Sequence, residues 1–202
     1  MIWIGLAVVV FLAALYKCPP PVFLRAPLSV LAVAAILFLA IAWNVSPTLP
    51  GQTPGKFYGL IFHFYGAALL TAMFGPAIAL TILFPVAILG IFVFQGGMIE
   101  AAHHYLMVCV LPSFFAYLTI QVIQKYIPKH LFVLILGNGY VAAFMSVILS
   151  GTVLLIGKML FAGAGTHIDL EGWLLGLIII AFMEGSLSGM LLAIFLIYRP
   201  IN

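Results

Sequence analysis

Charged side chains are what this sequence has least of. Only 5% of its 202 residues are charged, whereas 66% are hydrophobic. A soluble domain carries roughly a quarter charged residues, so this chain has too little polar surface to face water. It also has no run of basic residues, which leaves nucleic-acid binding without a basis. The composition therefore predicts an integral membrane protein.

Cysteine and catalytic motifs are similarly scarce. Cys18 and Cys109 lie in different apolar segments and form no metal-binding or redox spacing, so we expect both to be packing residues. A Walker A motif is missing, so any ATP hydrolysis must come from another subunit. No nucleophile–base pair or pair of acids has a spacing suited to catalysis. We therefore do not expect an enzyme.

Apolar stretches fill most of the chain and are separated by short segments rich in proline, glycine and charge. They cover residues 2–16, 27–44, 57–74, 77–94, 101–124, 131–157 and 172–198. A chain in lipid must satisfy its backbone hydrogen bonds within each segment, so each stretch is expected to be a helix. At Gly75-Pro76 a kinked helix and a tight helical hairpin both fit. The prediction is an all-α bundle of about seven transmembrane helices in a single domain, residues 1–202.

The basic residues indicate the orientation of these spans. Seven spans place two basic residues, Lys56 and Lys158, on one side of the membrane. The other side receives Lys17, Arg25, Lys125, Lys129 and Arg199. By the positive-inside rule the side with five is cytoplasmic. We therefore expect a multi-pass protein of the cell's inner (plasma) membrane, with its N-terminus outside and its C-terminus in the cytoplasm. An even number of spans would put both termini on one side and blur this asymmetry.

Aromatic residues agree with this orientation. An aromatic belt at the outer interface is expected to hold three tryptophans, which are Trp3, Trp43 and Trp173.

Most side chains that could bind a metal gather near the predicted outer face. They are His63 in the third apolar stretch, Glu100, His103 and His104 around the start of the fifth, and His167, Asp169 and Glu171 in the last outer loop. Imidazole and carboxylate groups suit divalent transition metals such as Co, Ni, Cu or Zn. We expect His63, nearly two turns inside its helix, to bind such an ion with His103 or His104, and Glu100 to be a further ligand. In the alternative interpretation the loop histidines are solvated and His63 bonds a neighbouring carbonyl.

Glu184 lies near the middle of the last apolar stretch. A charge there is costly in lipid, so an ionisable side chain at this depth indicates a functional site. We expect it to face the bundle interior. In the alternative interpretation it has no function and is protonated, or bonded to a serine or amide of a facing helix. The same stretch carries two glycine pairs at GxxxG spacing, which fits internal packing, the favoured interpretation, and also the docking of a partner. The pairs are Gly172–Gly176 and Gly185–Gly189.

Three stretches occur in an order that resembles one family of membrane proteins. They are WNVSPTLPGQTPGKFYGLIFHFYGAALLTAMFGP, EAAHHYLMVCVLPSFFAYL and WLLGLIIIAFMEGSLSGMLLAIFLIYRP. Together, over about residues 27–200, they resemble the cobalt- and nickel-specific substrate-binding (S) components of energy-coupling factor transporters. The resemblance implies seven helices, an outer N-terminus and a divalent metal ion as the bound species. It also implies an ATPase and a coupling transmembrane subunit as partners.

The resemblance assigns roles to individual residues. His63 falls on the histidine that coordinates the ion, Asn44 on the asparagine before the loop, and His103 on a position beside the site that is often asparagine. Metal-uptake members begin Met-His-Ile-Pro-Asp-Gly, and their N-terminal amine and second-residue histidine complete the coordination. Here Ile2 offers no side-chain ligand atom. The chain therefore resembles a branch of the family that lacks the N-terminal metal-binding loop.

The residues and the resemblance leave two functions open. The first is an S component or permease of an energy-coupling factor type ABC transporter for a cobalt- or nickel-like ion. The second is a membrane metal-binding or assembly subunit of a larger complex that does not itself transport.

Overall fold

Helices make up nearly all of the computed structural model, which describes residues 1–18, 28–44, 56–58, 60–61, 63–94, 97–128, 130–161 and 169–198. The α-helices are α1 (Ile2–Lys17), α2 (Leu28–Asn44), α3 (Ala67–Phe74), α4 (Pro76–Phe94), α5 (Met98–His104), α6 (Leu111–Tyr126), α7 (Ala142–Phe161) and α8 (Leu170–Tyr198). Two π-helical stretches, η2 (Tyr105–Val110) and η3 (Val133–Val141), continue into α6 and α7. Two short strands, β1 (Lys56–Phe57) and β2 (Leu60–Ile61), precede α3.

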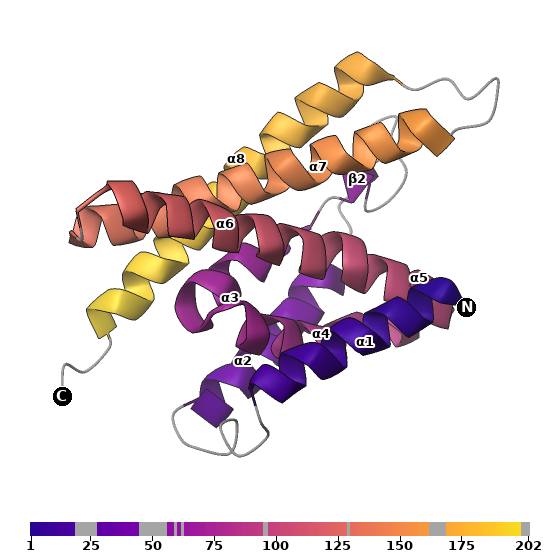
Figure 1. The fold of residues 1–202 in the computed structure, drawn as a ribbon, viewed down its shortest axis with the longest axis horizontal. Coiled ribbons are helices and arrows are strands. Elements are labelled where there is room, and N and C mark those ends of the chain that lie inside the picture. The colour runs from indigo at the N-terminus through magenta and orange to yellow at the C-terminus, as the bar shows by residue number, and fades with distance from the viewer. Residues whose placement is uncertain are drawn as a thin grey trace.

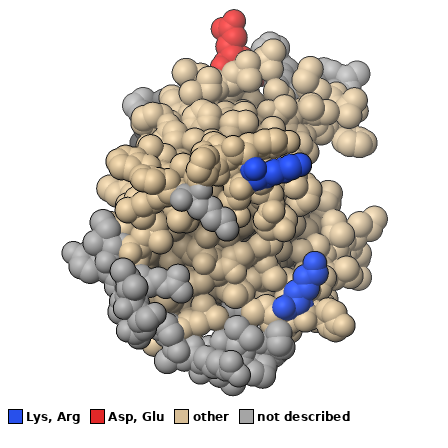
Figure 2. Space-filling model, turned by 60° about the vertical axis from the view of Figure 1, so that its left-hand side comes forward, with Lys and Arg blue, Asp and Glu red and all other residues tan. Residues whose placement is uncertain are grey.

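The surface of the helices suits lipid. Within the described residues, three continuous helices are long and apolar enough to cross a membrane, namely Met98–Tyr126, Val133–Phe161 and Leu170–Leu196. Large apolar side chains project from them, such as Phe161 and Phe182, which are 87% and 60% exposed. On the face shown in Figure 2, charged side chains are few and far apart. The predicted all-α membrane protein is therefore confirmed, whereas its seven spans and its orientation stay predictions.

The helices pack as two groups with α3 between them (Figure 1). In one group α7 lies against both α6 and α8, and in the other α1 and α2 lie against α4. The short helix α3 contacts α4, α6 and α8. In Figure 1 the start of α1 and the end of α8 lie at opposite ends of the molecule.

The third predicted helix, residues 57–74, is wrong in its first half. β1 and β2 form an antiparallel hairpin in which Phe57 pairs with Leu60, and helix begins only at Ala67. Tyr58 and Gly66 have φ angles of 49° and 70°, in the left-handed region that a right-handed helix excludes. The apolar run correctly indicated burial, but an apolar run of this kind does not distinguish a buried turn from a helix.

Gly75 and Pro76 separate two helices and do not form a kink within one. Gly75 has a φ angle of 83°, a conformation that glycine adopts without a steric penalty. Pro76 is the first residue of α4, where its missing N–H is no loss.

The second glycine pair of α8 serves internal packing, as the sequence favoured. A Cβ atom added at Gly139 of η3 would lie 2.9 Å from the Cα atom of Gly189, and one added at Gly185 would lie 3.1 Å from the carbonyl oxygen of Tyr140. Distances this short leave no room for a side chain, so the backbones of η3 and α8 touch directly.

Candidate metal centre

Two histidines from distant parts of the chain meet inside the bundle. His63 lies in the turn before α3 and is 7% exposed, and His104 is the last residue of α5. Their ring centres are 5.4 Å apart, with the ring planes tilted by 33°. The helix expected around His63 is absent, and the turn that replaces it brings His63 to the start of the fifth predicted helix.

Each of the two rings has one buried nitrogen without a hydrogen-bond partner among the described residues. The Nε2 atoms of His63 and His104 are buried and accept or donate no hydrogen bond among the described residues. A buried polar atom left unpaired is costly, and in native proteins it commonly indicates a bound ion or water. Burial also disfavours the charged imidazolium, and the neutral imidazole is the form that binds metals.

The other ring nitrogen of His63 fixes its tautomer. Nδ1 lies 3.2 Å from the carbonyl oxygen of Phe64. Because a carbonyl can only accept, the proton of the neutral ring lies on Nδ1 and the free lone pair lies on Nε2. This is the arrangement found at protein metal sites, where the second ring nitrogen donates to a carbonyl or carboxylate.

Trp43 lies against both histidine rings. Its ring centre lies 4.9 Å from that of His63 and 4.8 Å from that of His104, and its Nε1–H donates to the Phe64 carbonyl oxygen at 2.8 Å. Trp43 and Trp173 are only 2% and 3% exposed, so their side chains face the protein interior, whereas their depth near the outer interface stays a prediction. Sequence reasoning missed Trp43 as a site residue, although it directly precedes Asn44 in the first of the three family-like stretches.

His103 and Glu100 do not join this pair. His103 is exposed and packs nearly perpendicular to the ring of Trp3, with ring centres 5.4 Å apart. Adjacent helix residues point about 100° apart, so only one of the two histidines can face His63. Glu100 instead accepts a hydrogen bond from the Gly97 N–H and caps α5. In the part of the chain that the structure describes, no three His, Cys, Asp or Glu residues are placed to share an ion.

The other residues predicted near the outer face are not shown to join the histidine pair. Asp169 accepts a hydrogen bond from the Gly172 N–H at 3.0 Å and caps α8, and Glu171 is exposed in its first turn. His167 and the side chain of Asn44 lie outside the described residues.

Glu184 faces the bundle interior, as expected, and is completely buried. Its partners are two backbone amides of the turn before α3. Oε2 accepts from the Tyr65 N–H and Oε1 from the Gly66 N–H, both at 2.9 Å. Gly66 is the N-cap residue of α3, so the carboxylate lies at a helix N-terminus, where negative charge is stabilised. Nothing in the sequence indicated that Tyr65 and Gly66 would meet a residue of the last helix.

Solved structures with a similar fold are transport proteins. One is a truncated transition metal transporter, which matches with a TM-score of 0.66 and 17% identity over 97% of this chain and 92% of the other. Another is a transition metal transporter, with a TM-score of 0.63 and 18% identity over 98% of this chain and 86% of the other. At this identity the likeness shows the fold alone.

Sequence comparison shows the family. No curated protein matches the chain. The family model of the cobalt uptake substrate-specific transmembrane region, CbiM, matches residues 1–201, and the chain therefore belongs to the CbiM family.

Proposed function

We propose that this protein is the substrate-binding membrane component of an uptake transporter for a divalent transition-metal ion, cobalt- or nickel-like. The observation that carries the proposal is the pair of buried, unpartnered Nε2 atoms of His63 and His104. Membership of the cobalt-uptake family and the fold shared with two transition metal transporters support it.

The spacing of the two rings suits a shared ion. Metal–nitrogen bonds to imidazole are about 2.0–2.1 Å long, and the ring centre lies roughly 1 Å beyond the nitrogen, so two rings on one ion stand at most roughly 6 Å apart. The observed 5.4 Å lies within this limit. Imidazole suits Co, Ni, Cu and Zn. Because two neutral ligands leave the ion's charge uncompensated, we expect weaker and less selective binding than in a site with a complete ligand set.

Transport would require partner subunits. The chain has no Walker A motif, so ATP must be hydrolysed elsewhere. We propose an energy-coupling factor type ABC transporter in which this chain binds the ion at the outer face of the inner membrane. A coupling transmembrane subunit and an ATPase would then drive its release to the cytoplasm.

A second function is a metal-binding or assembly subunit that does not transport. The observation that favours it is the small ligand set, because no third His, Cys, Asp or Glu joins the histidine pair in the described part of the chain. ATP-dependent uptake of Ni²⁺ or Co²⁺ into vesicles, with and without the co-expressed partners, separates the two functions. Metal binding without uptake would support the assembly role.

The proposal is tested by titrating the purified protein with Ni²⁺, Co²⁺, Cu²⁺ and Zn²⁺ alongside His63→Ala. We expect one ion per chain, and a Kd raised at least about tenfold by the substitution, which corresponds to about 1.4 kcal/mol. Equal affinity in the two proteins would leave His63 as a packing residue that bonds a carbonyl.

A further inference from the structure

One peptide group connects the last helix to the histidine pair. The peptide between Phe64 and Tyr65 is planar, so its N–H and its carbonyl oxygen move together. Its N–H donates to Glu184 Oε2 at 2.9 Å. Its carbonyl oxygen accepts from Trp43 Nε1 at 2.8 Å and lies 3.2 Å from His63 Nδ1.

The backbone amides of the turn that contains this peptide find their acceptors on Glu184. Residues 63–66 belong to no helix or strand, yet they are buried, where a backbone N–H must find a partner. Glu184 supplies acceptors for two successive amides, those of Tyr65 and Gly66. Gly66 is itself confined, because it has a φ angle of 70° and a Cβ atom added there would lie 2.6 Å from Leu39 Cδ2.

The two bonds end on different oxygens of the side chain, an arrangement that suits a carboxylate. Its two oxygens are both acceptors, whereas a side-chain amide offers one acceptor oxygen and an NH₂ group that can only donate. A glutamine at position 184 would therefore lose one hydrogen bond and direct a donor at a backbone N–H. Bonds to an ionised acceptor are also stronger than neutral ones.

From this geometry we propose that Glu184 is the positioning residue of the metal site. It holds the Phe64–Tyr65 peptide so that the carbonyl oxygen meets both His63 Nδ1 and Trp43 Nε1, which directs His63 Nε2 toward His104. The inference rests on the proposed function, since it concerns binding of a metal by the same two histidines. Through this role α8 is linked to the site indirectly, by way of the Phe64–Tyr65 peptide.

The test compares Glu184→Gln with Glu171→Gln, a matched substitution at an exposed position of the same helix. In the metal-free protein, hydrogen exchange of fragments that contain Tyr65 and Gly66 is expected to be faster in Glu184→Gln only. With Ni²⁺ as the probe, Glu184→Gln is expected to raise the Kd about 10–100-fold, the range typical of residues that orient metal ligands. Glu171→Gln is expected to leave both measurements unchanged.

The outcomes separate this inference from the proposed function. If the wild-type chain binds Ni²⁺ and Glu184→Gln binds it equally well, Glu184 is merely structural and the positioning role is overturned. If the wild-type chain binds no Ni²⁺, Co²⁺, Cu²⁺ or Zn²⁺, the proposed function fails and the positioning role fails with it. Should Glu184→Gln not fold, Glu184→Asp replaces it in the test, because aspartate keeps both acceptor oxygens but places them on a side chain one methylene shorter. A wild-type Kd in folded Glu184→Asp would then overturn the role.

Discussion

The two adjacent histidines at the end of α5 have the same chemistry and different surroundings. His104 keeps its Nε2 buried and lies 4.8 Å, between ring centres, from Trp43. His103 is exposed and meets Trp3 at the start of α1. A buried, unpaired nitrogen gains most from a ligand, because a solvated one already has water. A substitution of the exposed His103 is therefore a matched control for the same substitution of the buried His104.

We expect His104→Ala to raise the Kd for Ni²⁺ at least about tenfold, since it removes one of two imidazole ligands, a difference of about 1.4 kcal/mol or more. His103→Ala is expected to change the Kd less than about twofold. Equilibrium dialysis of the purified variants measures both. If His103→Ala lost Ni²⁺ binding while His104→Ala kept it, His103 would be the ligand and the assignment to His104 would be contradicted.

Among the secondary-structure elements, those in long apolar runs could be predicted from the sequence, and the short ones before α3 could not. The stretches 101–124, 131–157 and 172–198 correspond to helical runs at 98–126, 133–161 and 170–198, because a long apolar run in lipid has few alternatives to a helix. The hairpin and turn before α3 could not be predicted in this way. The amides of Tyr65 and Gly66 in that turn are satisfied by Glu184, more than a hundred residues later in the chain. No local pattern signals such a partner.

The candidate site shows the same division. Residue chemistry and position were enough to expect His63 to meet one of the histidines of α5. They could not select between His103 and His104, because the rotation of a helix about its axis depends on tertiary packing. Trp43 was assigned to a membrane interface, since nothing local separates a tryptophan at that depth from one turned inward.

The contact between η3 and α8 gives a prediction for this pair of elements. Gly139→Ala is expected to lower the free energy of unfolding by about 1–3 kcal/mol, the usual effect of overpacking, because its Cβ atom would meet the Gly189 backbone at 2.9 Å. Gly157→Ala of α7 is the control, because nothing lies within 4 Å of its added Cβ atom and alanine favours helix by about 1 kcal/mol. Denaturant unfolding in mixed micelles measures both. Equal destabilisation by the two substitutions would contradict the close contact.

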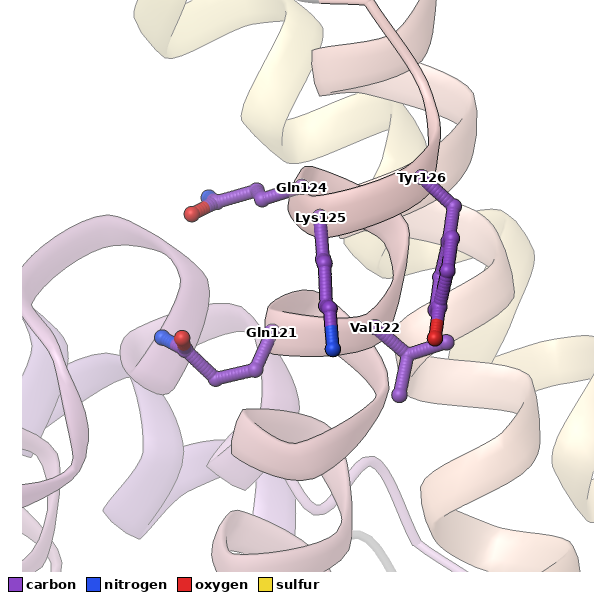
Figure 3. A pocket seen from close by; sticks show the side chains of 5 residues that line it. All are labelled: Gln121, Val122, Gln124, Lys125 and Tyr126. Atoms are coloured by element: carbon purple, nitrogen blue, oxygen red, sulfur yellow. The ribbon is translucent and has the colours of Figure 1, made fainter.

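For the whole molecule, the two ends of the bundle have different chemistry. The histidine pair lies near one end of the helical run 98–126, and a hollow lined by Gln121, Val122, Gln124, Lys125 and Tyr126 lies near the other (Figure 3). His104 and Lys125 are 21 residues apart on this run, or roughly 30 Å at about 1.5 Å per residue. That length matches the hydrocarbon core of a bilayer, about 30 Å.

From the uneven distribution of basic residues, we expect Lys125 on the cytoplasmic side and Lys56 outside. In intact cells, Lys56→Cys is expected to react with a membrane-impermeant maleimide, and Lys125→Cys only after permeabilisation. The native Cys18 and Cys109 are both buried, so the unsubstituted chain is the background control. Labelling of both introduced cysteines from the same side would contradict the orientation.

The central claim is that His63 and His104 together hold one metal ion. X-ray absorption at the nickel edge of the Ni²⁺-loaded protein tests it most directly, because imidazole rings give a distinctive scattering pattern that counts them. We predict two imidazoles in the wild-type chain and in His103→Ala, and one or none in His63→Ala. A spectrum that shows only oxygen ligands, or that is the same with and without His63, would contradict the claim.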